Sequence, residues 1–170
     1  DIAFSFINAE TNGALIKGNK EDQLYGFDYN KFLVIKENCA TNKVNFWISL
    51  AGADEKELRS ARMNTIAGNP TSRARLVDEL VAFAIEHGCY GISVDWEFPK
   101  TQQAKNNHVS LLEDFAAKIA NSSNKDLQIA KKLRHDFNDA LKWIPAIRLI
   151  SLRNVDDDVG SNTHTAQEIS

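Results

Sequence analysis

The chain has 170 residues, of which 43% are hydrophobic and 25% charged, and its formal net charge is -3 at pH 7. That length supports one domain with a real core, and the composition is ordinary for a globular protein. With no run of Lys or Arg, nothing suggests nucleic-acid binding, and no apolar stretch approaches the roughly 20 residues that span a membrane. Asp1 leads directly into an apolar run, so we expect either a cytosolic protein or one whose leader has been removed.

The first half of the chain alternates short apolar runs with helical patterns. The run at 3–7 predicts a strand, followed by a turn-rich loop at 8–13. A weak helical pattern at 27–37 leads through a loop at 38–42 to an almost wholly apolar strand at 44–50. Residues 54–63 are expected to be helical, until Asn69-Pro70 breaks the chain.

The strongest predicted helix follows this break. Thr71 or Ser72 is expected to cap its start, and Gly88 to end it. One stripe at helical spacing should face the core, and it comprises Leu76, Val77, Leu80, Val81, Ala84 and Ile85.

The stretch 91–98 has strand periodicity, with one apolar and one acidic face. Pro99 is expected to stop this strand. Residues two apart on a strand lie about 7 Å apart at Cα. If Asp95 and Glu97 are buried, the repulsion between their two negative charges would raise the pKa of one of the two carboxyl groups. A proton held near neutral pH is what a general acid needs. The plain alternative is a solvent-facing acid pair, against which we set Trp96 between the acids and the amphipathic helix that leads into the strand.

Beyond the acidic strand we expect a polar loop at 101–107 and a helix at 109–120. A short strand at 127–130, a helix at 136–143, a last strand at 146–152 and a polar loop or tail at 154–170 follow. The recurring strand–helix order predicts one α/β domain over 1–170 with parallel strands, whose following loops share one face.

Four stretches carry a family likeness. CYGISVDWEFP resembles the Asp-Gly-x-Asp-x-Asp-x-Glu signature of glycoside hydrolase family 18, the chitinases and chitinase-like proteins. NPTSRARLVDELVAFAIEHG resembles the helix before that strand. VNFWISLAG resembles the preceding strand, with Ser49-Leu50-Ala51-Gly52 in place of Ser-x-Gly-Gly, and IAFSFIN resembles the strand before it. The likeness runs from about Ile2 to Pro99 and weakens beyond Leu112.

The resemblance implies a (β/α)8 TIM barrel with its site at the carboxyl ends of the strands. Such a barrel takes roughly 250 residues, and the family's first and last strands have no candidates in this sequence. We therefore expect an incomplete barrel, a single partial domain.

The resemblance also implies hydrolysis of β-1,4-linked N-acetylglucosamine, as in chitin, with retention and attack by the substrate's own N-acetyl group. Glu97 would be the general acid and Asp95 would orient the N-acetyl group. Ser93, Trp96, Phe6 and Ser49 would bind substrate. No metal or cofactor is implied, and secretion is expected.

Two positions of the acidic signature depart from the family pattern, with Tyr90 in place of the Asp before the glycine and Ser93 in place of the first acid. The family's later Met-x-Tyr-Asp strand would fall near Ser151-Leu152-Arg153-Asn154, where its Tyr and Asp are missing. These departures keep open a weak or inactive chitinase-like protein that binds a carbohydrate or a partner. A further alternative is a subunit whose barrel is completed by a second chain.

The two cysteines, Cys39 and Cys89, each precede a predicted strand. In a parallel barrel both would lie at the bottom face, so either a disulfide or two buried thiols is expected. The four histidines show no spacing typical of a zinc site.

Overall fold

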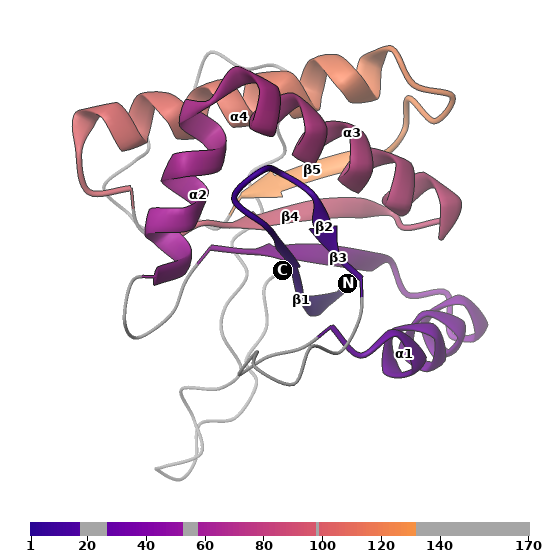
Figure 1. Cartoon of the computed structure of the whole chain (residues 1–170). Helices are drawn as coiled ribbons and strands as arrows, with labels where there is room; N and C mark the ends of the chain where they lie inside the picture. The colour runs from indigo at the N-terminus through magenta and orange to yellow at the C-terminus, as the bar shows by residue number, and fades with distance from the viewer. Residues whose placement is uncertain (18–26, 53–57, 98, 132–170) are drawn as a thin grey trace, which may run out of the picture.

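The computed structural model describes residues 1–17, 27–52, 58–97 and 99–131. The predicted helix at 136–143, strand at 146–152 and tail at 154–170 lie outside these residues. The elements, shown in Figure 1, are β1 (Ile2–Ala9), β2 (Leu15–Ile16), α1 (Tyr29–Thr41), β3 (Phe46–Ala51), α2 (Leu58–Gly68), α3 (Pro70–Glu86), β4 (Gly91–Asp95), α4 (Gln102–Ala120) and β5 (Gln128–Lys131).

These strands form one sheet in the order β2-β1-β3-β4-β5. β1, β3, β4 and β5 are parallel, whereas β2 returns antiparallel along the end of β1. Each parallel strand is joined to the next through one or more helices, which is the repeating unit of a (β/α)8 barrel. The predicted α/β class is therefore confirmed, and the described strands form an arc of such a barrel.

The helices cover one face of this sheet. α2, α3 and α4 lie side by side over it (Figure 1). α1 packs on the same layer, since the ring of Phe32 in α1 lies 5.4 Å from the ring of Phe83 in α3. Under the helices, Ile48 and Leu50 of β3 pair in register with Ile92 and Val94 of β4, and all four side chains are fully buried. The core therefore lies between the sheet and the helices.

Several helix boundaries differ from the sequence prediction in the first half of the chain; α2, expected at 54–63, continues to Gly68. α1 continues to Thr41, through the expected loop at 38–42, because Cys39 is buried in the core and keeps the last turn packed. α3 is capped by Asn69 rather than by Thr71 or Ser72. The Asn69 side chain accepts hydrogen bonds from both of those backbone N–H groups, and Pro70 occupies the first helical position, where its missing N–H costs nothing.

The loop predicted at 101–107 is wrong, because α4 begins at Gln102. Thr101 caps the helix by accepting a hydrogen bond from the N–H of Ala104 at 3.1 Å. The early end of β4 is a second correction: the strand stops at Asp95, not at Phe98. Its neighbour β3 ends at Ala51, which pairs with Asp95, and no described residue of either neighbouring strand pairs with the chain beyond that point.

β2 was not predicted. It follows a tight turn in which Gly13 has a φ of +85°, a conformation that favours glycine. The N–H of Leu15 donates to the Glu79 carboxylate of α3 at 2.9 Å. This bond fastens the hairpin to the helix layer.

Cys39 and Cys89 are both free and buried, so the structure supports two buried thiols and not the disulfide. Burial raises the pKa of the Cys89 thiol to about 12, against the smaller opposing effect of Lys36. The thiol therefore stays protonated and unreactive at neutral pH.

The other edge of β1 is open along its first half in the described part of the chain. Backbone groups alternate in direction along a strand, and the N–H of Ile2 points toward β3, where it donates to Asn45 at 2.9 Å. The backbone groups of Ala3 and Ser5 therefore point away from β3. Ile2 is 45% exposed and Ser5 is also exposed, so solvent reaches this edge.

Candidate active site

The two acids lie at the carboxyl end of β4, which has β3 on one side and β5 on the other. All five residues of β4 are buried, those on the inner face as well as those under the helices. Asp95 is the last of them, and it is 8% exposed. Because Ile92 and Val94 face the helices, alternation places Ser93 and Asp95 on the opposite, inner face of the sheet.

Glu97 follows two residues later, beyond the end of the strand. The residue is half-buried, and its Oε1 atom is withdrawn from solvent. Between the acids, Trp96 is buried against the helix layer, where its indole N–H donates to Ser60 of α2 at 2.9 Å. Because Trp96 points to the helices, strand-like alternation continued past Asp95 would direct Glu97 to the same side as Asp95.

Gly52 brings a second backbone against the segment that carries the two acids. It directly follows β3, and a Cβ placed on it would lie 2.5 Å from Trp96 Cα and 2.9 Å from the carbonyl oxygen of Asp95. A side chain therefore cannot be accommodated without moving the backbone. The absence of one lets the end of β3 approach the acid-bearing segment closely.

The predicted substrate-binding serines lie below Asp95 on the inner face. Ser5, Ser49 and Ser93 pair in register across β1, β3 and β4 and form one row. Ser49 is 3% and Ser93 1% exposed. Phe6 is half-buried, at the register shift between Ser5 and Ile7. The structure thus brings Ser49 and Ser93 together, and substrate contact by these residues stays a prediction.

A lower row on the same face is made by Trp47 and Gly91, which also pair in register. A Cβ on Gly91 would meet the Trp47 ring, so the indole lies across this glycine. Tyr90 packs edge-on against the same indole at 5.3 Å, at the start of β4 and therefore at the end of the strand away from the acids. The buried Ser93 Oγ and Trp47 Nε1 atoms have no hydrogen-bond partner in the described part of the molecule.

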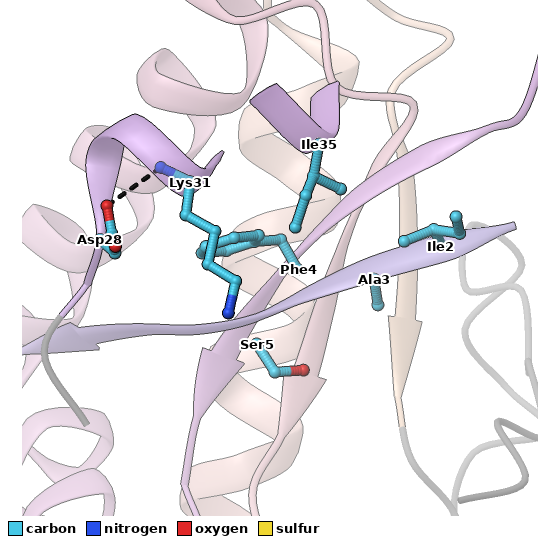
Figure 2. A pocket seen from close by; sticks show the side chains of 7 residues that line it. All are labelled: Ile2, Ala3, Phe4, Ser5, Asp28, Lys31 and Ile35. Atoms are coloured by element: carbon cyan, nitrogen blue, oxygen red, sulfur yellow. Dashed lines mark hydrogen bonds between the residues drawn. The ribbon is translucent and has the colours of Figure 1, made fainter. Parts of the chain in front are cut away.

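Two cavities lined by described residues lie away from the acids. One, of about 290 Å3, lies between the open edge of β1 and α1 (Figure 2). The other, of about 370 Å3, lies near the starts of β3 and β4 and includes Cys89 and Tyr90. Neither includes Asp95 or Glu97, so the candidate site rests on the position of the acids at the carboxyl end of the sheet.

Among residues 1–17, 27–52, 58–97 and 99–131, no three His, Cys, Asp or Glu side chains are grouped in a way that could hold a metal ion. Over the same residues, no helix is long and apolar enough to cross a membrane.

Two partners of Trp96, Ser60 and His108, were not predicted from the sequence. A buried Trp N–H requires an acceptor, which indicates that some partner exists. The sequence gives no signal for which residue supplies it, because α2 precedes the acidic strand by many residues. His108 is 1% exposed, with its ring 4.9 Å from that of Trp96.

Comparison with known proteins decides the family. The sequence profile described as "Glycosyl hydrolases family 18" matches residues 1–151. The chain belongs to this family. The resemblance stated from the acidic strand and its neighbours is therefore confirmed.

A class V chitinase from Arabidopsis thaliana is 26% identical over 126 residues, which are 72% of this chain and 31% of that protein. The Group IV chitinase of Ostrinia furnacalis, solved with allosamidin, superposes with a TM-score of 0.62 at 18% identity and covers 77% of this chain and 34% of its own. A class V chitinase mutant from Nicotiana tobaccum, solved with NAG4, gives a TM-score of 0.59 at 18% identity and covers 77% of this chain and 37% of its own. The chain thus spans about a third of these relatives, and the structural likeness establishes the fold.

Proposed function

We propose that this family 18 chain carries the acid-bearing part of a chitinase-type active site, which hydrolyses β-1,4-linked N-acetylglucosamine with retention. The observation that supports the proposal most directly is the position of Asp95 and Glu97. They stand at the carboxyl end of a strand flanked on both sides by parallel strands, the end at which barrel enzymes place their chemistry.

In the proposed reaction, Glu97 donates its proton to the glycosidic oxygen as the bond to the anomeric carbon breaks. The carbonyl oxygen of the substrate's N-acetyl group attacks that carbon from the opposite side and forms a cyclic oxazolinium ion. The Asp95 carboxylate accepts a hydrogen bond from the amide N–H, which orients the acetyl group and stabilises the positive charge. Water then opens the ring while Glu97 takes up its proton, which restores the acid and gives retention.

The buried surroundings suit these roles. Asp95 lies almost wholly out of solvent, where its charge interacts more strongly with a developing cation than it would in water. Glu97 has one oxygen withdrawn from solvent and is half-buried as a residue, so the other side of the carboxyl group can reach a substrate.

A second candidate function is carbohydrate binding without turnover. Ser93 favours it, because this side chain lies directly below Asp95 and is a hydroxyl with no charge. A hydroxyl can donate a hydrogen bond to a carboxylate but cannot share a proton with it as a second acid can. Secretion of the chain, and chitin as its ligand, belong to this proposal in either form.

The deciding experiment is turnover of a fluorogenic chitooligosaccharide by the wild type and by Glu97→Gln. The substitution keeps the side-chain shape and removes the acid, so activity should fall at least about 10²- to 10⁴-fold, the contribution of general acid catalysis. Glu113→Gln is the matched control, since Glu113 is an exposed residue of α4, and it should retain full activity.

Equal activity in wild type and Glu97→Gln would reject the proposed acid. Chitin binding by a wild type that shows no turnover would instead favour the second candidate. In that case an Asp95→Asn variant should bind chitin more weakly, because it removes the charged acceptor of the amide hydrogen bond.

A further inference from the structure

Trp96 connects the two acids to the helix layer. It is 2% exposed and stands one residue after β4, between Asp95 and Glu97. Its side chain contacts residues of α2 and α4, the helices that cover the outer face of the sheet (Figure 1). The indole is therefore placed by the helices, while its neighbours in sequence belong to the inner face.

Three contacts fix this tryptophan. Its indole N–H donates to Ser60 Oγ at 2.9 Å. The ring packs against His108 with the centroids 4.9 Å apart and the planes 33° apart. Gly52 brings backbone against the Trp96 Cα. Because indole has a single donor, the bond to Ser60 is the only direct hydrogen bond that can set the rotation of the ring.

Glu97 depends on this arrangement more than Asp95 does. Asp95 is held in the sheet by its pairing with Ala51 of β3. Glu97 lies beyond the last residue pair of the described ladders. The backbone that carries Glu97 is therefore positioned through its neighbour Trp96 and not by sheet pairing.

We propose that Ser60 is a positioning residue for the Glu97 acid and acts through the Trp96 indole. The inference rests on the proposed function for its effect on turnover. A displacement of about 1 Å in a reacting group can cost on the order of 10²-fold in rate. Loss of the Ser60 hydroxyl leaves the buried indole N–H without its acceptor, so the ring should shift and move the backbone that carries Glu97.

The test compares Ser60→Ala with Asn64→Ala. Asn64 lies on the same helix and accepts a hydrogen bond of 2.9 Å from Asn107 of α4, so its loss removes a side-chain hydrogen bond of α2 other than the one to Trp96. On a fluorogenic chitooligosaccharide, Ser60→Ala should lower kcat at least 10-fold and change KM less than 2-fold. Asn64→Ala should keep kcat within 2-fold of wild type, and Ser60→Thr, which retains the hydroxyl, should recover most of it.

A second measurement does not need turnover. The carboxyl carbon of Glu97, assigned in NMR spectra through Glu97→Gln, can be titrated with pH in each variant. A pKa of Glu97 that moves in Ser60→Ala, and stays in place in Asn64→Ala, supports the positioning role even where the wild type shows no activity. That inactive wild type would reject the proposed function alone.

Equal kcat values in Ser60→Ala and Asn64→Ala, or an unchanged Glu97 titration in Ser60→Ala, would overturn the inference. Urea unfolding of each variant shows whether the two substitutions cost similar stability. If Ser60→Ala does not fold, Ser60→Thr and Ser60→Cys carry the comparison. The kcat of Ser60→Thr should match that of wild type. The kcat of Ser60→Cys, in which the acceptor is weaker, should be lower than that of wild type but still measurable.

Discussion

Gly52→Ala tests how closely the end of β3 must approach the acid-bearing segment. The added Cβ would lie 2.5 Å from Trp96 Cα and 2.9 Å from both Asp95 O and Trp96 Cβ. Carbon atoms prefer separations of about 3.5–4.0 Å, so the two backbones would have to separate by about 1 Å. Neither can yield by rotating a side chain, because two of the three contacted atoms belong to the backbone.

Overpacking of this kind typically costs about 1–3 kcal/mol, and we expect Gly52→Ala near the upper end, about 2–3 kcal/mol. For a domain of this size each kcal/mol lowers Tm by about 2–4 °C, which gives a fall of about 4–12 °C. Urea unfolding followed by tryptophan fluorescence measures the free energy, and differential scanning calorimetry measures Tm.

Gly88→Ala is the matched control. Gly88 ends α3 with a φ of +61° and has nothing within 4 Å of an added Cβ. Its substitution costs only the left-handed backbone conformation, about 1–2 kcal/mol. A loss in Gly52→Ala no larger than that in Gly88→Ala would refute the close approach at the candidate site.

Three further predictions concern single side chains. Glu79→Ala should destabilise by about 1–3 kcal/mol, since it removes the acceptor of the Leu15 N–H. Although burial alone would raise the pKa of Glu79, this bond and Arg75 lower it. The stability that the Glu79 carboxylate contributes is therefore present above about pH 4.5 and is lost as the pH falls through the lower folded pKa. In urea unfolding, the stability difference between wild type and Glu79→Ala should shrink in acid. Burial lowers the pKa of His87 below 6.5, so the fold is more stable above that pH, where the ring is neutral, and loses stability as the ring is protonated. In His87→Gln the urea midpoint should fall less as the pH is lowered. A pH dependence equal to that of wild type would contradict this role of His87. Ser93→Ala removes a buried hydroxyl that has no hydrogen-bond partner among the described residues. The free energy of unfolding should therefore stay equal or rise by up to about 1 kcal/mol. A loss above about 1 kcal/mol would show that the hydroxyl has a partner.

The elements that the sequence predicted best are those whose pattern comes from burial. β4 and α3 bury opposite sides of one core, so Ile92, Val94, Leu76 and Leu80 leave a periodic signal in the chain. The position of Asp95 on the inner face follows from the same alternation. The family motif added the expected barrel, which the comparison with known proteins supports.

The errors fall where tertiary contacts or capping override local pattern. The first two turns of α4 bury only Ala104 before His108 is reached, so no apolar stripe announces this helix. The start of α4 is marked by Thr101, which caps it, but the polar residues around Thr101 were interpreted as a loop. The end of β4 depends on where β3 ends, which no local feature of Asp95 or Trp96 specifies.

The edge of β1 that the described residues leave open has a consequence for association between molecules. Outward-pointing backbone groups at Ala3 and Ser5 are a template on which another extended chain can pair. Lys31 of α1 lines the cavity beside this edge, and Figure 2 shows its ammonium group close to the strand near Ser5. A strand arriving there would have to displace the water around that charge, which is costly. We therefore expect Lys31 to disfavour strand pairing at this edge, so that removal of its charge lowers the protein concentration at which such pairing begins.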